Sequence, residues 1–287
     1  MLRILVCLLL ACAPACAEPM VSGKAWPPTS AAPTFSTPNV NGTARFAKSA
    51  DNVRIGPVVI TDAFRAVETD HGVIVRGLRI DGLTGRNLQR DGIRLRDARD
   101  TEINSFNLSM RAEPQTADQF PVGITIYAGS NIVLRDGVVE GFRHIDPAGK
   151  HNQGDGIGTE NGVDGMTIER VTASNNGDSG FDLKGRIVGR DLVAERNGNA
   201  IKVWHDVQIT TLTAIDNKRV IHLASGAKLR IDRLVARSSS KAFVIITEGK
   251  GEITISSCDL TGMAPNSVLV QRNGPGAVLN LGPGCRL

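Results

Sequence analysis

The chain has 287 residues, of which 41% are hydrophobic and only 4% are aromatic. Its 33 basic and 29 acidic side chains leave a formal net charge of +4, and so mild a balance argues against nucleic acid as the main partner. With few aromatics, 31 glycines and many valines and isoleucines, the composition favours stacked short strands over a helical bundle.

The N-terminus has the pattern of a secretory signal peptide. Arg3 precedes a short apolar run that ends in an Ala-Cys-Ala cleavage pattern at Ala17, so residues 1–17 are assigned to the signal. The run is too short for a membrane span. A lipoprotein site at Cys12 is the alternative, and it fits less well because Leu10 precedes the Ala-Cys pair. We therefore expect a secreted or periplasmic protein.

The segment 18–45 is rich in Pro, Ser, Thr and Ala, which is typical of a flexible leader or linker. Strand-like segments begin near Val53, although 62–68 could form a helical turn. We expect residues 46–287 to form one domain and the protein to be a monomer.

The rest of the chain repeats a short phrase in which a small residue, an apolar residue and a polar residue follow one another. Aligning the apolar residues gives successive intervals of 31, 33, 24, 20, 20 and 22 residues by subtraction. The aligned residues are Ile93, Ile124, Ile157, Phe181, Ile201, Ile221 and Phe243. One strand per repeat of this length, with a second strand later in each repeat, predicts an all-β fold, a right-handed parallel β-helix.

The two long intervals contain insertions at 110–121 and 142–153. Loops of this kind could form the walls of a groove beside the strands. The second insertion carries His144, Asp146 and His151, which could form a lid or a second site.

Side chains alternate across a strand, so the aligned apolar residues face the core and their neighbours face outward. The outward positions place Asp182 beside Lys202, with Lys184 and Trp204 next to them. His222 follows one repeat later, and His205 ends the strand that holds Lys202. We treat Lys184, Trp204, His205 and His222 as candidate contacts for an extended polymer, because an aromatic ring can stack on sugar.

Asparagine recurs shortly before the first strand of four repeats, at Asn152, Asn176, Asn197 and Asn217. Stacked amides can hydrogen-bond from coil to coil, so these residues are interpreted as structural. Outside the signal segment the cysteines are Cys258 and Cys285, 27 residues apart by subtraction. This is about one coil, so they could form a disulfide or remain two buried thiols.

The segment 176–183, NGDSGFDL, resembles the Asn-x-Asp-Asp-Gly-Phe/Trp-Asp-Leu motif of polysaccharide lyase family 9, pectate lyases with a lysine base. One repeat upstream, Asp155-Gly-Ile resembles the Asp-Gly-Phe phrase of the family, and one repeat downstream 198–202, GNAIK, resembles its Gly-Asn-Gly-Phe-Lys phrase. The resemblance covers about 150–220. It implies that Asp155, Asp178 and Asp182 bind Ca²⁺ and that Lys202 is the catalytic base. Ser179 stands where the family has a further calcium-binding aspartate, so the metal site would lose one charge.

The implied reaction is β-elimination on an acidic, uronate-containing polysaccharide. Removing the C5 proton requires neutralisation of the adjacent carboxylate, which calcium supplies as a Lewis acid. A nearby cation would also lower the lysine pKa, whereas an unneutralised aspartate would raise it and disable the base. The alternatives are a plain surface ion pair at Lys202, a C5-epimerase, and a non-catalytic carbohydrate-binding β-helix that has lost its site. A family 28-type glycoside hydrolase fits less well, since the Gly-His-Gly and Arg-Ile-Lys motifs of that family are missing.

Overall fold

The computed structural model describes residues 20–21, 34–36, 43–116, 120–149, 152–274 and 276–287. Within these residues all regular structure is β-strand, and there is no helix. The segment 62–68, for which a helical turn was one expectation, instead leads into a strand at Arg65–Thr69. The predicted signal peptide, residues 1–17, lies outside the described residues.

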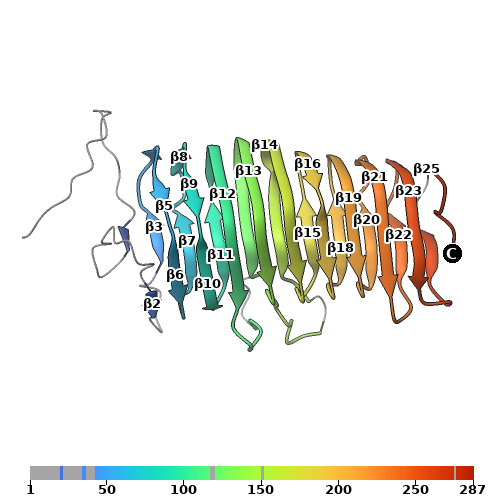
Figure 1. Cartoon of the computed structure of the whole chain (residues 1–287), viewed down its shortest axis with the longest axis horizontal. Coiled ribbons are helices and arrows are strands. Elements are labelled where there is room, and N and C mark those ends of the chain that lie inside the picture. The colour runs from blue at the N-terminus through green and yellow to red at the C-terminus, as the bar shows by residue number, and fades with distance from the viewer. Residues whose placement is uncertain (1–19, 22–33, 37–42, 117–119, 150–151, 275) are drawn as a thin grey trace, which may run out of the picture.

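The strands stack side by side into a parallel β-helix (Figure 1). Its first sheet is a continuous ladder of ten strands, each in register with the next. In chain order these are β3 (Ala44–Phe46), β7 (Arg65–Thr69), β11 (Asp91–Leu95), the first part of β13 (Val122–Glu140), the first part of β14 (Asp155–Ser174), β15 (Ser179–Leu183), β18 (Asn199–Val203), β20 (Arg219–Leu223), β22 (Phe243–Thr247) and β24 (Val268–Arg272).

Each coil continues through two further sheets. They are built from β5 (Arg54–Ile55), β6 (Val58–Thr61), β9 (Arg79–Asp81), β10 (Leu83–Leu88), β12 (Asp97–Met110), the later parts of β13 and β14, β16 (Arg186–Arg190), β17 (Leu192–Glu195), β19 (Asp206–Ile215), β21 (Lys228–Ser238), β23 (Glu252–Met263) and β25 (Val278–Leu281). Where the sequence predicts one second strand, the structure has two, because polar residues with positive φ, among them Asp136, Arg170 and Asp191, turn the chain between the sheets.

The described N-terminal strands start earlier than the leader segment 18–45 suggests. Ala44 is fully buried and opens the first sheet, and β2 (Thr34–Ser36) pairs with β6. Strands β4 (Ala50–Asp51) and β8 (Ile74–Arg76) form a short extra side that continues onto β12. The short β1 (Met20–Val21) pairs with β3 in the antiparallel sense.

The core lies inside the coils and is built from columns of apolar side chains. Ile93, Ile124, Ile157, Phe181, Ile201 and Ile221 are each fully buried and form one column, as the sequence predicts. The column continues with Ile245, not with the predicted Phe243, which lies in register with Arg219. A shift of two residues keeps the same face of a strand, so apolar alternation alone could not reveal it.

An asparagine ladder closes the turn before the first sheet. The Nδ2 of Asn176 donates to Oδ1 of Asn197 over 3.0 Å, and the Nδ2 of Asn197 donates to Oδ1 of Asn217 over the same distance. The ladder begins at the backbone N–H of Phe142, which donates to Oδ1 of Asn176. The structural role predicted for these residues is therefore confirmed for three of the four, whereas Asn152 is exposed in the second insertion.

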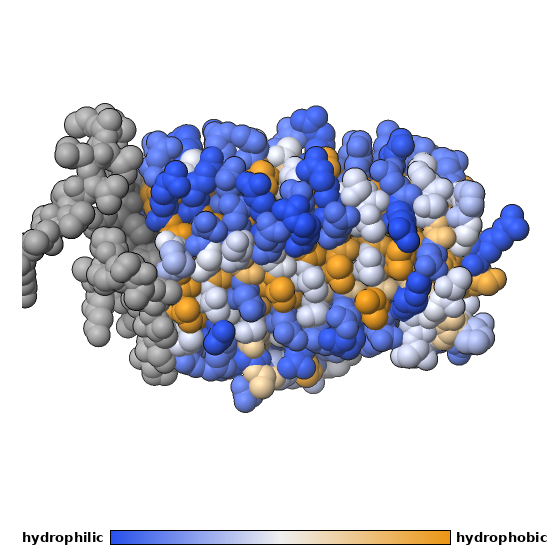
Figure 2. Space-filling model, viewed as in Figure 1, coloured by the Kyte–Doolittle hydropathy of each residue, from blue (hydrophilic) through white to orange (hydrophobic). Residues whose placement is uncertain are grey.

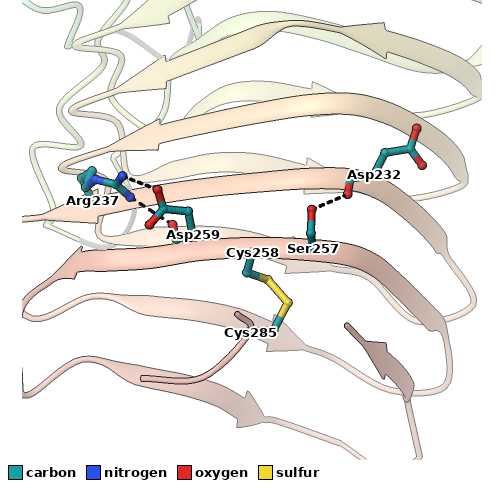
Figure 3. Close-up of a disulfide and its surroundings, with 6 residues drawn as sticks. All are labelled: Asp232, Arg237, Ser257, Cys258, Asp259 and Cys285. Atoms are coloured by element: carbon teal, nitrogen blue, oxygen red, sulfur yellow. Dashed lines mark hydrogen bonds and ion pairs between the residues drawn. A yellow bond between two sulfur atoms is a disulfide. The ribbon is translucent and has the colours of Figure 1, made fainter. Parts of the chain in front are cut away.

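A disulfide joins Cys258 to Cys285 and ties the C-terminal segment to β23 (Figure 3). Of the two predicted alternatives, a disulfide and a pair of buried thiols, the structure contains the disulfide. The part of the chain that the structure describes contains no helix with the length and apolarity needed to cross a bilayer. Hydrophilic side chains cover most of the face in Figure 2, with apolar ones among them in a middle band.

Candidate functional site

The first sheet carries a column of outward-facing residues, here called the outward column. It consists of Arg94, Thr125, Gly158, Asp182, Lys202 and His222, each in register with the next. Asp182 and Lys202 are therefore direct neighbours across β15 and β18, as the sequence predicts. Neighbouring strands lie about 4.8 Å apart, so an extended polymer could pass along this column.

Lys202 is held by Asp178, which lies in the turn before β15. Its Nζ lies 2.5 Å from Oδ2 of Asp178, and its side chain is 18% exposed. The other oxygen of Asp178 accepts a hydrogen bond of 2.8 Å from Nδ2 of the fully buried Asn199. The sequence suggests Asp182 as the partner of Lys202, but the turn brings Asp178 closer.

Asp182 contacts an aromatic side chain instead. Its Oδ1 accepts a hydrogen bond of 2.5 Å from Nε1 of Trp204, a residue that is 39% exposed. The Nζ of Lys184 lies 5.7 Å from the centre of the Trp204 ring and 2.9 Å from Oε2 of Glu160. The exposed indole therefore lies directly beside Lys184 and Asp182, where it could stack on a sugar ring.

Asp155 has a structural partner at the corner where the first sheet begins. Its Oδ1 accepts a hydrogen bond of 2.9 Å from the backbone N–H of Ser179, one coil later. Asp91, two coils before Asp155 in the same corner, accepts from the N–H of Val122 in the same way. Both aspartates precede a glycine, and a Cβ at Gly156 would lie 2.6 Å from the carbonyl oxygen of Gly180. Only glycine fits so close an approach of two coils.

Ser179, the departure from the lyase motif, is part of the same corner. It is fully buried, and its Oγ lies 3.3 Å from Nδ2 of Asn199. The small Ser179 side chain therefore packs within this corner of the sheet.

Burial and the charges of the cluster shift the pKa of Asp155, Asp182 and Lys202. Burial, together with the charges of Asp182 and Asp178, raises the pKa of Asp155 well above its usual value. Burial also raises the pKa of Asp182, although Lys184 and Lys202 oppose this. Burial lowers the pKa of Lys202, but the charge and hydrogen bond of Asp178, with Asp155 and Asp182, outweigh it and raise the lysine pKa. The structure thus brings the four predicted residues together, and it keeps the lysine protonated.

As the side chains lie, the acids hold an ammonium group. Both oxygens of Asp178 are engaged, by Lys202 and by Asn199, and one oxygen of Asp155 is engaged by Ser179. In the described ranges, no group of three or more Asp, Glu, His or Cys side chains is arranged to hold a metal ion. These contacts would have to change before the acids could bind Ca²⁺, and calcium binding stays a prediction.

The two predicted histidines lie at different distances from this cluster. His222 is next to Lys202 in the outward column, and its Nε2 lies 2.6 Å from Oε1 of Glu248. His205 is exposed and contacts Asn161 at 3.2 Å, on the side where the chain leaves the first sheet.

The two insertions project from one edge of the β-helix (Figure 1) and are hydrogen-bonded to each other. The N–H of Gln115 donates to the carbonyl of Arg143, and the N–H of Ile145 donates to the carbonyl of Gln115. His144 is buried, its ring lies 5.1 Å from the Phe120 ring, and its two ring nitrogens have no hydrogen-bond partner among the described residues. His151 lies outside the described residues.

Sequence reasoning missed two residues that position the cluster. Asn199 orients Asp178, and Glu160 holds Lys184. Glu160 could have been found, because it precedes Lys184 in the same outward position one coil earlier. Asn199 belongs to the segment 198–202 that resembles the lyase phrase, but its contact with Asp178 appears only in the fold.

No protein-family model matches the chain, and no curated protein matches it. Among solved structures it is similar to an alginate lyase from Paenibacillus sp. str. FPU-7, with a TM-score of 0.56 and 14% identity over 83% of this chain and 91% of that chain. The tailspike protein gp49 from Pseudomonas phage LKA1 matches with a TM-score of 0.35 and 12% identity, over 83% of this chain and 51% of that chain. The first similarity agrees with the fold of this chain, a parallel β-helix.

Proposed function

We propose that this chain is a lyase that cleaves an acidic, uronate-containing polysaccharide by β-elimination, with Lys202 transferring the proton. The observation that carries the proposal is the placement of Lys202, whose side chain is mostly buried among three carboxylates yet belongs to an outward column. The resemblance of 176–183 and 198–202 to family 9 lyases supports the same role. The alginate lyase fold supports the substrate class.

In the proposed reaction the free amine of Lys202 takes the proton from C5 of the uronate. The electron pair of that C–H bond forms the C4–C5 double bond, the C4–O bond breaks, and the leaving oxygen takes a proton from the Lys202 ammonium or from water. Trp204 and Lys184, which lie beside each other next to Lys202, would bind the sugar and its carboxylate, which positions the reacting carbon. His222 and His205 would extend these contacts along the polymer.

The Lys202–Asp178 contact limits this reaction, because the amine must lose its proton before it can act as a base. Calcium dependence is the part of the proposal that comes from the family resemblance, and we propose to test it separately. Export through the predicted signal peptide is also proposed. The Cys258–Cys285 disulfide supports it, since disulfides persist in oxidising compartments.

A second function, non-catalytic binding of polysaccharide, is favoured by the same contact. A lysine whose pKa is raised by Asp178 remains an ammonium group, and in that state it binds carboxylates without removing protons. The open indole of Trp204 would serve binding equally well.

The test is absorbance of the unsaturated uronate product on polygalacturonate and on alginate, with calcium and with chelator. A lyase gains absorbance, a hydrolase gains only reducing ends, an epimerase changes the uronate composition alone, and a binder only retains the polymer. We expect Lys202→Ala to lose at least about a hundredfold in rate, as is usual for loss of a general base. Lys228→Ala, on an exposed lysine of β21, is the matched control. Full activity of Lys202→Ala would remove the lysine from its proposed role.

A further inference from the structure

A group of arginines lies on the first sheet near its N-terminal end, remote from Lys202. Arg94 belongs to the outward column, Arg96 follows it, and Tyr127 stands one coil later. We propose that Arg94, Arg96 and Tyr127 form a second binding site, one that takes a carboxylate-bearing sugar of the same acidic polysaccharide. The identity of the polymer rests on the proposed function, whereas the binding site itself rests on the arginines.

Tyr127 and the two guanidinium groups form one compact unit. The Cζ of Arg96 lies 4.2 Å from the centre of the Tyr127 ring, and the Cζ of Arg94 lies 5.6 Å from it. Stacking on an aromatic face fixes the plane of a guanidinium group and leaves its edge available for planar, two-point contact with a carboxylate.

Both arginines lack an acidic partner among the described residues. The Nε atoms of Arg94 and Arg96 are buried and have no hydrogen-bond partner there. Because these Nε atoms are closed to solvent, the donors that remain for a carboxylate are the terminal nitrogens of the two guanidinium groups.

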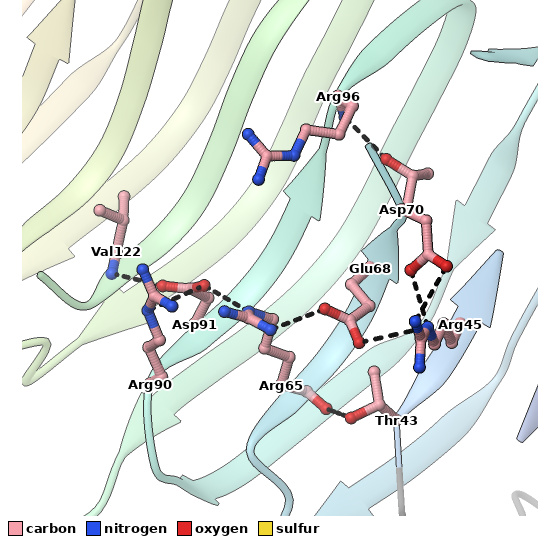
Figure 4. A network of polar contacts seen from close by, with 10 residues as sticks. Thr43, Arg45, Arg65, Glu68, Asp70, Arg90, Asp91, Arg96 and Val122 are labelled. Atoms are coloured by element: carbon pink, nitrogen blue, oxygen red, sulfur yellow. Dashed lines mark hydrogen bonds and ion pairs between the residues drawn. The ribbon is translucent and has the colours of Figure 1, made fainter. Parts of the chain in front are cut away.

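The nearby carboxylates are already engaged elsewhere (Figure 4). Glu68, which is in register with Arg94, contacts Arg65 at 2.7 Å. Asp91 contacts Arg65 at 2.6 Å and Arg90 at 3.6 Å. In Figure 4 the guanidinium of Arg96 extends away from this network, and only its backbone N–H makes a marked contact there, with Thr69. The two arginines are therefore left to bind an external anion.

The site is aligned with the cluster around Lys202. Arg94 leads through Thr125, Gly158 and Asp182 to Lys202 in four steps of register, a separation of roughly 19 Å at about 4.8 Å per strand. Thr125 and Gly158 are small, so the floor between the two sites is low. An extended polymer of several sugar rings could lie along the column and contact both sites at once.

The residues between the two sites indicate which class of polymer can bind. Asp182 and Glu160 border the path, where they contact Trp204 and Lys184, and they disfavour the dense, continuous charge of a nucleic acid backbone more than spaced carboxylates. A polyuronate carries one carboxylate per sugar, which lets separate carboxylates meet Arg94 and Arg96 at one end and Lys184 at the other.

The experiment measures binding of oligouronates by calorimetry, using Lys202→Ala protein so that no substrate is consumed. We expect Arg94→Gln/Arg96→Gln to weaken binding of a long oligomer by roughly tenfold or more, since it removes two charge-assisted contacts. Binding of a disaccharide, too short to reach both sites, should change much less. Arg190→Gln/Arg233→Gln removes the same charge from two exposed arginines of β16 and β21 and is the matched control.

Several outcomes would overturn the second site. These are equal weakening by the control pair, equal weakening for short and long oligomers, or equal affinity for a single-stranded oligonucleotide of matched charge. Arg94→Lys/Arg96→Lys keeps the charge and should lose part of the affinity, which guards against misfolding of the glutamine variant. If wild type shows no lyase activity but the arginine effect holds, the proposed function fails and the binding site stands. If wild type is active and the arginine substitutions have no effect on long oligomers, the second binding site fails and the proposed function stands.

Discussion

Asp155 and Asp91 are the same residue type at the same corner of the first sheet, yet their surroundings differ. Each accepts a backbone N–H from a later coil, Ser179 for Asp155 and Val122 for Asp91. Asp91 also has a close cation, because Arg65 lies 2.6 Å away. Burial raises the pKa of both carboxyl groups, but at Asp91 the charges of Arg65 and Arg90 oppose the shift, whereas at Asp155 the charges of Asp182 and Asp178 add to it.

Asp155→Asn and Asp91→Asn should therefore change stability in opposite directions. The folded-state pKa of Asp155 is raised, so wild type loses stability as pH rises from the unfolded pKa through the folded one. Asparagine keeps the acceptor for Ser179 without that loss, and we expect Asp155→Asn to be more stable at neutral pH. Asp91→Asn removes a partner of the buried Arg65 and should cost up to about 3–5 kcal/mol. Urea unfolding at pH 4 and pH 7 measures both, and a neutral-pH loss in Asp155→Asn would contradict the argument.

The Asp178–Lys202 contact predicts how activity depends on pH. Because Asp178 helps raise the pKa of Lys202 above its ordinary value, the free amine forms only at high pH, and kcat/KM should rise with pH. In Asp178→Asn, burial is opposed by fewer charges, the lysine pKa falls, and the rising limb should move to lower pH. Asp164→Asn, an exposed carboxylate that contacts Arg186, is the control and should leave the limb in place. An unmoved limb in Asp178→Asn would exclude Lys202 as the titrating base.

For single residues, the sequence predicts which side chains share a surface, but not which of them form hydrogen bonds or ion pairs. The period of two on a strand put Asp182, Lys202 and Trp204 on one outward surface, and they lie there. Lys202 contacts Asp178 and Asp182 contacts Trp204, and both contacts depend on side-chain rotamers and on the turn before β15. The spacing of residues in the sequence predicts neither contact.

The asparagine ladder shows how one element type connects successive coils. Asn197 accepts from both the backbone N–H and the Nδ2 of Asn176, at 2.9 and 3.0 Å, and its Nδ2 donates to the carbonyl of Ala173. One side chain therefore satisfies polar groups of two coils at the turn that leads to Asp178.

Asn197→Ala should be strongly destabilising because it leaves buried polar groups of Asn176 and Ala173 without their partners. Each such group costs about 1–3 kcal/mol. Asn152→Ala, on the exposed asparagine that lies outside the ladder, should change stability by less than about 0.5 kcal/mol. Thermal and urea unfolding of the two variants give the comparison, and equal stability of both would mean that the ladder contributes little.

The whole molecule follows from the repeat, and the repeat is visible in the sequence. Six aligned apolar residues from Ile93 to Ile221 form one core column, which was enough to predict a parallel β-helix. The three-sided shape of each coil was not predicted. It depends on polar residues such as Asp136 and Asp191 adopting positive φ, and these residues look like ordinary surface positions in the sequence.

At the C-terminal end, the disulfide should stabilise the last coil. Cys258 and Cys285 close a loop of 27 residues, for which chain entropy predicts about 3.5 kcal/mol. Cys258→Ser/Cys285→Ser should therefore expose β24 and β25 to proteolysis while the contact of Lys202 with Asp178 persists. Limited proteolysis with mass mapping distinguishes this from global unfolding, which would show cleavage throughout the β-helix.

The register of the first sheet has a consequence for the lifetime of the site. Each coil rests only on its neighbours, so opening starts at a free end and advances one coil at a time. Lys202 stands in the seventh of the ten strands, three strands from the C-terminal end and six from the N-terminal end. Fraying would reach it sooner from the C-terminal side, and that is the end which a covalent staple holds closed.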